Sequence, residues 1–319
     1  MKKILTLLAL TISFIMNAQL TAVTEGGNTG QRLSTSNASN HGNIGSDAVD
    51  LSVQSLASST RGATGFKAVA MGSNTTASGS ISTAIGNANE ASGTFSTSMG
   101  VSTLASGYGS TSMGNYTVAN GWHSTAMGSN TTASGSYSTA IGLYATASDY
   151  SSTVIGQHNS SGSSVTNNAT SFSTSNTAFV IGNGENSDNK SDAFKVMFDG
   201  TTTIAGDLTI NSDARLKANI TSLGGTLAKL LKIDGKSYTM KKDQSEKKKI
   251  GLLAQDIQKV FPELVLESQG IKSVNYQGLV PVIINALKEQ DRKMKEQDRK
   301  MREQEERLER LERLVANMD

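Results

Sequence analysis

Ser212 and Lys217, five residues apart, are the pair of side chains in this sequence whose types could support nucleophilic catalysis. A serine hydroxyl is a poor nucleophile at neutral pH, so a partner lysine must be neutral to accept its proton, which requires burial or a nearby positive charge such as Arg215. On one continuous helix these side chains would point about 140° apart, so contact requires a non-helical segment or a second chain. Taken alone, the residues also fit a simpler interpretation, in which Ser212 is a helix N-cap and Lys217 a solvated helix residue.

No other residues form a recognisable site. His41, His123 and His158 are too few and too scattered to bind a metal, and the chain has no cysteine for a disulfide or a thiolate site. The sequence shows no spacing typical of a catalytic triad or a phosphate-binding loop. We therefore expect neither a cofactor nor a metal.

The composition favours an elongated or oligomeric protein. Of the 319 residues only 36% are hydrophobic and 5% aromatic, which is too few for large compact cores. The chain carries 39 of its 56 Lys, Arg, Asp and Glu residues from Ser212 onward, so the formal net charge of +2 hides two physically different regions.

The N-terminus has the pattern of a secretory signal peptide over residues 1 to 18. Lys2 and Lys3 precede a short apolar run, residues 4 to 16, and we expect cleavage after Ala18. A retained membrane anchor is the alternative, but the run is too short to span a bilayer core of about 30 Å. We therefore expect a secreted or outer cell-surface protein with no transmembrane span after signal removal.

A 14-residue repeat dominates residues 62 to 160, after a polar leader, residues 19 to 61, which we expect to be irregular. A fixed period of this kind indicates a solenoid, here with two short strands and two turns per coil. We expect a row of Ile or Met and a row of Ala to face a narrow interior, and the glycines to lie in turns that need positive φ. The glycines that follow Ile or Met are Gly72, Gly86, Gly100, Gly114, Gly128, Gly142 and Gly156.

The repeat, with A-S-G turns and S-T-A-I-G or S-T-S-M-G strands, resembles the head repeats of YadA-like trimeric adhesins. The resemblance implies a trimer of left-handed parallel β-rolls that adheres to a partner such as a host glycan or an extracellular-matrix protein. A disordered Gly/Ser-rich linker is the alternative, and the strict register of the apolar residues argues against it.

Residues 161 to 210 are expected to form an insertion and a short β neck. The strand motif returns at Ile181-Gly182, which is 26 rather than 28 residues after Ile155-Gly156. Residues 193 to 198 and 201 to 210 then predict two strands joined by a turn.

The sequence after residue 250 is mainly helical in pattern. Residues 251 to 260 and 276 to 288 have a helical pattern, and Pro262 ends the first. Interleaved acidic and basic residues between 291 and 313 indicate a solvated helix flank rather than a nucleic-acid-binding face. A heptad over residues 287 to 319 predicts a coiled coil, with Leu287, Met294, Met301, Leu308 and Val315 seven residues apart.

Three motifs in this region resemble the endosialidase-type intramolecular chaperone: S-D-A-R-L-K from Ser212, G-L-L-A-Q-D from Gly251 and V-N-Y-Q-G-L-V-P from Val274. The resemblance implies a trimeric α/β chaperone domain over residues 211 to 288 that assists the folding of a fibrous cargo and then cuts itself off. In that family a serine–lysine dyad makes the cut. This implies that Ser212 becomes the new N-terminus, that Lys217 assists it, and that Asn211–Ser212 is the scissile bond.

The repeat also contains an aromatic row and a threonine row, and each of them fits more than one function of the surface. Phe66, Tyr108, Trp122 and Tyr150 share one phase, so they form an aromatic stripe that would pack at a trimer interface or touch glycans or host protein. A glycan-cleaving domain is excluded, because residues 62 to 160 contain too few carboxylates. A threonine ladder would suit ice binding or would simply stabilise stacked strands; its members are Thr83, Thr97, Thr111, Thr125, Thr139 and Thr153.

These features predict a mainly β protein with an α-helical C-terminus: a parallel β-roll solenoid, a short β neck and an α/β chaperone domain ending in a trimeric coiled coil. We expect a homotrimeric adhesin-like fibre whose tail acts as a chaperone and as a serine peptidase on its own chain only. The alternatives are a phage-type tail fibre with the same chaperone, which the signal peptide argues against, and a β-solenoid ice-binding protein.

Overall fold

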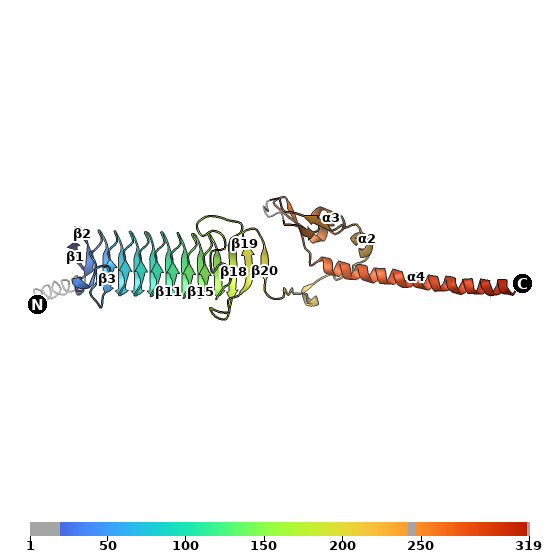
Figure 1. Cartoon of the computed structure of the whole chain (residues 1–319), viewed down its shortest axis with the longest axis horizontal. Helices are drawn as coiled ribbons and strands as arrows, with labels where there is room; N and C mark the ends of the chain where they lie inside the picture. The colour runs from blue at the N-terminus through green and yellow to red at the C-terminus, as the bar shows by residue number, and fades with distance from the viewer. Residues whose placement is uncertain (1–19, 242–246, 318–319) are drawn as a thin grey trace, which may run out of the picture. The chain divides into compact units, whose positions relative to one another are not determined.

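The computed structural model describes residues 20 to 241 and 247 to 317, in two compact units that divide between Ile210 and Asn211. The first unit is a regular roll of stacked coils, as Figure 1 shows. The expected signal peptide, residues 1 to 18, lies outside the described residues. The expected fold class, a mainly β chain with a parallel solenoid and a C-terminal helix, is confirmed.

Each coil of the repeat contributes one five-residue strand to a long sheet and one two-residue strand to a second sheet. Strands pair in parallel one repeat apart, so that Thr97 pairs with Thr111 and Met99 with Met113. The 14-residue period therefore sets the register, because like residues stack on like residues. The five-residue strands are β3 (Val49–Val53), β5 (Val69–Ser73), β7 (Thr83–Asn87), β9 (Thr97–Val101), β11 (Thr111–Asn115), β13 (Thr125–Ser129), β15 (Thr139–Leu143) and β17 (Thr153–Gln157). The two-residue strands are β4 (Gly62–Ala63), β6 (Thr76–Ala77), β8 (Glu90–Ala91), β10 (Leu104–Ala105), β12 (Val118–Ala119), β14 (Thr132–Ala133) and β16 (Thr146–Ala147).

Small side chains line the interior of the roll. Ser98 of β9, Ser112 of β11 and Ala105 of β10 are fully buried, whereas Met99 points to the outer face and is only partly buried. The expectation that the Ile/Met row faces the interior is therefore wrong, although the Ala row does face it. Neighbours in a strand point to opposite faces, and the interior has room for Ala and Ser, so the larger residues lie outside. This outer apolar row consists of Met71, Ile85, Met99, Met113, Met127, Ile141, Ile155 and Ile181.

Two glycine rows allow successive coils to approach closely. Gly100 has φ of +128°, and a Cβ there would lie 2.0 Å from the Gly114 carbonyl oxygen of the next coil. Its row lies within the long strands rather than in turns, where we expected it. The turns themselves place non-glycine residues in the left-handed region, such as Ser102 at φ 53° and Tyr116 at φ 52°.

The leader, residues 19 to 61, which we expect to be irregular, contains regular structure in its described part. β1 (Leu20–Glu25) and β2 (Asn28–Leu33) form an antiparallel hairpin, and β2 pairs in parallel with β3. The 3-10 helix η1 (Ala38–Asn40) follows β2. The hairpin extends the long sheet at its N-terminal end, and its polar composition gave no periodic signal because few of its side chains are buried.

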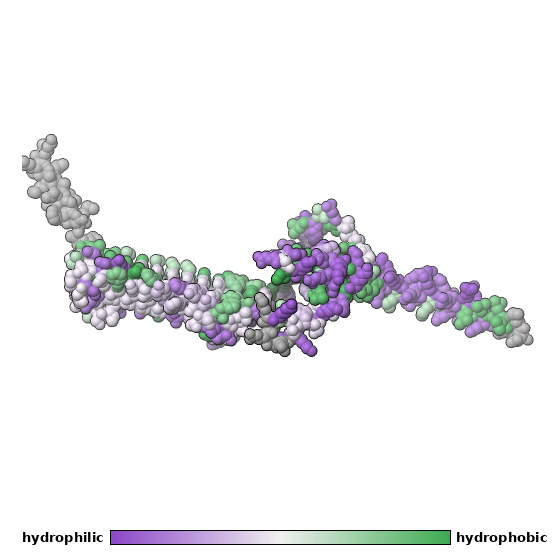
Figure 2. Space-filling model, turned by 90° about the horizontal axis from the view of Figure 1, so that it is seen from above, coloured by the Kyte–Doolittle hydropathy of each residue, from purple (hydrophilic) through white to green (hydrophobic). Residues whose placement is uncertain are grey.

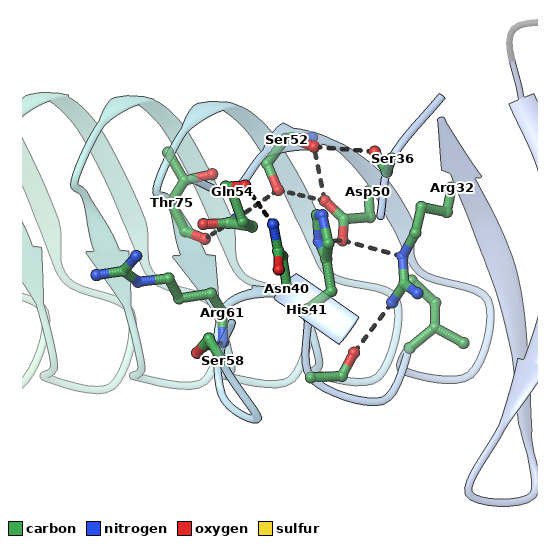
Figure 3. A network of polar contacts seen from close by, with 12 residues as sticks. Arg32, Ser36, Asn40, His41, Asp50, Ser52, Gln54, Ser58, Arg61 and Thr75 are labelled. Atoms are coloured by element: carbon green, nitrogen blue, oxygen red, sulfur yellow. Dashed lines mark hydrogen bonds and ion pairs between the residues drawn. The ribbon is translucent and has the colours of Figure 1, made fainter. Parts of the chain in front are cut away.

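A buried ionic network closes the first coil (Figure 3). The Asp50 carboxylate lies 2.8 Å from His41 Nδ1 and 3.5 Å from Arg32 Nε, and it accepts a hydrogen bond from the Ser52 amide. Arg32 also pairs with Glu25 at 2.6 Å. Burial raises the pKa of Asp50, but the hydrogen bonds from His41 and Ser52 outweigh it, so the net effect is a lowered pKa.

Asp149 anchors the insertion that follows the last coil. It stands 14 residues after Gly135, where the glycine row Gly65, Gly79, Gly93, Gly107, Gly121 and Gly135 would continue. Its carboxylate accepts hydrogen bonds from the Thr166 amide at 2.6 Å and the Thr177 amide at 2.8 Å. β18 (Thr177–Asn183) then returns to pair in parallel with β17. The sheet continues through β19 (Asp192–Met197) and β20 (Thr202–Ile204), which are antiparallel neighbours.

The second unit is small and its core is formed mainly by two helices. Ile257 and Phe261 pack with Leu264, Leu279 and Val282, all of them buried. Its helices are α2 (Thr226–Leu230), α3 (Ala254–Val260) and α4 (Leu279–Ala316), with the 3-10 helices η2 (Ala214–Leu216) and η3 (Pro262–Leu264). Its strands form two hairpins, β21 (Lys236–Tyr238) with β22 (Lys249–Gly251) and β23 (Val265–Ser268) with β24 (Ile271–Val274).

The heptad residues lie on α4 and are exposed in the single chain. Leu287 is 59% exposed, Leu308 is 58% exposed and Val315 is 63% exposed. Figure 2 shows that the far end of this helix is apolar (green), whereas its middle is hydrophilic (purple). A single exposed helix with such a seam is the pattern that a coiled-coil partner would cover.

Candidate self-cleavage site

The candidate site lies on an exposed stretch of chain at the boundary between the two units. Residues 205 to 213 form no strand or helix, and every residue from 202 to 224 is exposed. The boundary between the units lies after Ile210, and the Asn211–Ser212 bond lies one residue further along the chain. Cleavage there would separate the units almost at their natural division.

Lys217 and Ser212 are in direct contact. The Lys217 ammonium donates a hydrogen bond to the Ser212 hydroxyl over 2.7 Å. They lie on either side of η2, and Lys217 is the C-cap of that turn with extended backbone angles of −120° and 144°. The expected need for a non-helical segment is met by this single turn of 3-10 helix.

Asp213, rather than Ser212, is the N-cap of this turn. Its carboxylate accepts a hydrogen bond from the Arg215 amide at 2.9 Å and pairs with the Arg215 guanidinium at 2.6 Å. The Arg215 side chain, followed by its amide, holds the pKa of Asp213 below its ordinary value. Arg215 is therefore engaged by Asp213, and its charge is largely compensated before it could act on Lys217.

The arrangement has a nucleophile and a base in contact but lacks the environment that would activate them. Ser212 and Lys217 are both exposed in the single chain, so water reaches both side chains. A hollow of ≈ 420 Å³ borders the serine and is lined by Asn211, Ser212, Asp213, Arg215 and Leu216. A second chain that covered this hollow would supply the missing burial.

Several residues that support this unit were not singled out from the sequence. Glu289 of α4 accepts hydrogen bonds from the amides of Thr226 and Leu227, at 2.9 and 3.1 Å, and so caps α2. The Tyr276 hydroxyl accepts a hydrogen bond from the Leu252 amide at 3.0 Å. Leu252 and Tyr276 belong to the two motifs that begin at Gly251 and Val274, so the sequence did offer a signal for their contact. Nothing in the charged sequence around Glu289 marks it as a helix cap.

Comparison with known families assigns both parts of the chain. Residues 212 to 266 match the family model described as chaperone of endosialidase. Six overlapping segments between residues 63 and 159 match the model of the YadA head domain repeat. The chain carries YadA head repeats and an endosialidase chaperone domain. Both resemblances are thus confirmed, and the candidate dyad lies at the first residues of the chaperone match.

A phage protein shares part of this sequence. The long tail fiber protein Gp37 of Escherichia phage AR1 is 29% identical over 100 residues, which are 28% of this chain and 9% of that protein. The chain thus spans only a small part of this relative. In residues 20 to 241 and 247 to 317, no helix is long and apolar enough to cross a membrane.

Proposed function

We propose that the chain forms a homotrimeric, secreted or surface-exposed adhesin-like fibre, whose C-terminal domain guides trimer assembly and then cleaves the Asn211–Ser212 bond. The contact between Lys217 and Ser212 at the start of the chaperone domain is the observation that carries the proposal. The head would be the functional product and the tail a folding aid.

The outer apolar row supports trimerisation of the head. Met71 is 40% exposed and Ile141 is 41% exposed, and the row continues at one side chain per coil through Ile181. Apolar rows run along a roll that is otherwise pale in Figure 2. If the same row of another copy packed against it, coil against coil, both rows would be removed from water.

The tail supports the same conclusion. Ile250 is 87% exposed and Leu231 is 77% exposed, which is unusual for large apolar side chains of an isolated small domain. Because α4 also presents its seam to solvent, association would bury apolar residues along the whole tail. Burial of the Ser212 site by an adjacent chain would link cleavage to completed assembly, since only then would Lys217 lose its solvation.

Light scattering and intact-mass measurement on the secreted chain test the proposal together. We expect a trimer that converts from full length to fragments of residues 19 to 211 and 212 to 319. A stable monomer would overturn the assembly part, and a trimer that stays full length after prolonged incubation would overturn the cleavage part. A chain lacking residues 212 to 319 should give little soluble head, because stacking coils across three chains is non-local and slow.

The second candidate is a phage-type tail fibre, which the similarity to Gp37 favours. The two candidates differ in export. Expression of a C-terminally tagged Ser212→Ala copy, which should remain uncleaved at residue 212, distinguishes them, because an adhesin-like fibre should be secreted with loss of residues 1 to 18, whereas a tail fibre should remain inside the cell and keep those residues.

Ice binding has weaker support than either candidate. The threonine ladder lies on the same outer face as the Ile/Met row, since Thr97 and Met99 are two apart in β9, and its members are only partly exposed. The proposed trimer would cover this face. Absence of ice-recrystallisation inhibition by the purified head is the expected result.

A further inference from the structure

Aromatic rings form a connected ladder along one edge of the roll, in the coils between β9 and β17. Phe95 contacts Tyr108 with ring centroids 5.4 Å apart, and Tyr108 contacts Trp122 at 5.3 Å. The series continues through His123, which stacks on Tyr137 at 5.4 Å. These rings come from two neighbouring phases of the repeat, so the stripe expected from one phase is broader and more continuous than the sequence indicated. Tyr150 closes the ladder with a contact to Tyr137 at 5.5 Å.

The ladder is accessible and its polar atoms are free to bind a ligand. Trp122 is 58% exposed, Tyr137 is 49% exposed and Tyr108 is 38% exposed. Within the part of the chain that the structure describes, neither the Trp122 indole N–H nor the Tyr108 hydroxyl bonds to another protein group. Each ring therefore offers an apolar face together with an unused hydrogen-bonding atom.

A second copy of the chain is a poor occupant for this surface. Parallel rolls in register would contact one another coil after coil, and the outer Ile/Met row, which runs through the whole repeat, suits such a contact. The series of ring contacts is local, because Ser80 and Ile81 of the same two phases separate Phe66 from its first ring, Phe95, and Ser151 follows its last ring, Tyr150. A local cluster on a repeating scaffold indicates a site for a ligand of limited length.

The charge of the surface identifies the class of ligand. From Ala91 to Ser148 the sequence contains no Lys, Arg, Asp or Glu, so no fixed charge lies in the coils that carry the ladder's centre. An acidic polysaccharide, a nucleic acid or a charged protein would find no counter-charge there. A neutral sugar needs none, because its C–H groups pack on the electron-rich ring faces while its hydroxyls bond the tyrosine and indole groups.

We propose that the ladder from Phe95 to Tyr150 binds a neutral, extended oligosaccharide, with Trp122 and Tyr108 as the central stacking platforms. The coil spacing of about 4.8 Å is close to the length of one pyranose residue in an extended chain, so successive sugars would meet successive rings. This inference deepens the proposed adhesin function and rests on it.

Trp122 is the only tryptophan of the chain, so its fluorescence reports directly on the site. Purified trimer would be titrated with neutral probes (cellohexaose, chitohexaose and maltohexaose) and with anionic heparin and hyaluronan fragments. We expect a neutral probe to shift the Trp122 emission to the blue and to bind equally well at low and high salt. Tyr108→Ala should weaken that binding about tenfold. Tyr144→Ala is the matched control, since Tyr144 is similarly exposed (47%) but stacks on His158, away from the ladder.

Three results would overturn the proposal: no response to any neutral probe, a response confined to the anionic probes, or equal losses in Tyr108→Ala and Tyr144→Ala. Light scattering of the same samples keeps the assignments separate. A trimer that binds none of the neutral probes contradicts the glycan site and leaves the fibre intact as a proposal. Dissociation of Tyr108→Ala into monomers would show that the ladder is an interface between copies, which also contradicts the glycan site.

Discussion

Lys217 Nζ lies 2.7 Å from Ser212 Oγ because a single 3-10 turn between them reverses the geometry that an α-helix would impose. Five residues of α-helix would separate the side chains by about 140° around the axis. The turn keeps them together within one chain, so in the proposed cleavage an adjacent chain would supply burial and would not be required to complete the pair. This distinction determines how variants at the site should behave.

The first prediction concerns the dyad. Ser212→Ala should abolish cleavage because it removes the nucleophile, and Lys217→Arg should slow it at least about a hundredfold, because arginine keeps the charge but cannot accept a proton. Both variants should still form full-length trimers. Intact mass after incubation is the measurement, with Ser222→Ala, an exposed serine of the same segment, as control. Cleavage of Ser212→Ala at the wild-type rate would place the chemistry elsewhere.

The second prediction concerns the N-cap. Asp213→Ala removes the acceptor for the Arg215 amide, so η2 should lose its preferred geometry and cleavage should slow severalfold. Asp213→Asn retains a capping oxygen and breaks only the ion pair with Arg215. We expect this variant to cleave at close to the wild-type rate when intact mass is followed over a time course. Equal loss in both variants would assign the role of Asp213 to its charge instead.

The sequence was sufficient to predict the roll, because a 14-residue period with fixed glycines admits few other structures. It did not indicate which face of each strand is inside. Ile85 and Ala84 are adjacent, and hydrophobicity alone favours the larger residue for the core, whereas stacked coils leave room only for the smaller one. The N-terminal structure was missed for a related reason: Arg32 of the hairpin and its partners His41 and Asp50 are polar, and their mutual pairing becomes visible only in three dimensions.

At the candidate site the motif identified Ser212 and Lys217 but not their partners. Spacing alone allowed either a helix or a turn, and the choice depends on the capping geometry of Asp213. Arg215 was a candidate to assist the lysine, yet it lies next to a closer carboxylate. Glu289 lies more than sixty positions after the α2 residues that it caps, and a contact between such distant positions leaves no local signal in the sequence.

The third prediction separates the two faces of β11. Ser112→Leu should prevent formation of the head, because the fully buried position has no room and overpacking costs about 3 kcal/mol in each chain. Met113→Asp places a charge on the outer row and should give a folded roll that no longer trimerises. Circular dichroism and light scattering distinguish the two outcomes. If Met113→Asp unfolded the roll while Ser112→Leu did not, the assignment of inside and outside would be reversed.

The last prediction concerns the ionic network at the N-terminal end. Asp50→Asn leaves Arg32 and His41 buried without their carboxylate, which should destabilise the head by about 3 kcal/mol at neutral pH. Because the pKa of Asp50 is lowered on folding from its ordinary value of 3.8, its ionised form stabilises the head fully above that pH. This stabilisation is lost as the pH falls through the lower folded-state pKa, since the carboxyl is then protonated in both states. Thermal unfolding of the wild type and of Asp50→Asn should be measured between pH 7 and strong acid. We expect the two melting temperatures to differ at neutral pH and to converge in acid. A difference that stayed constant over this range would mean that Asp50 acts by its shape rather than by its charge. Glu185→Gln, an exposed carboxylate of the same unit, should match the wild type throughout.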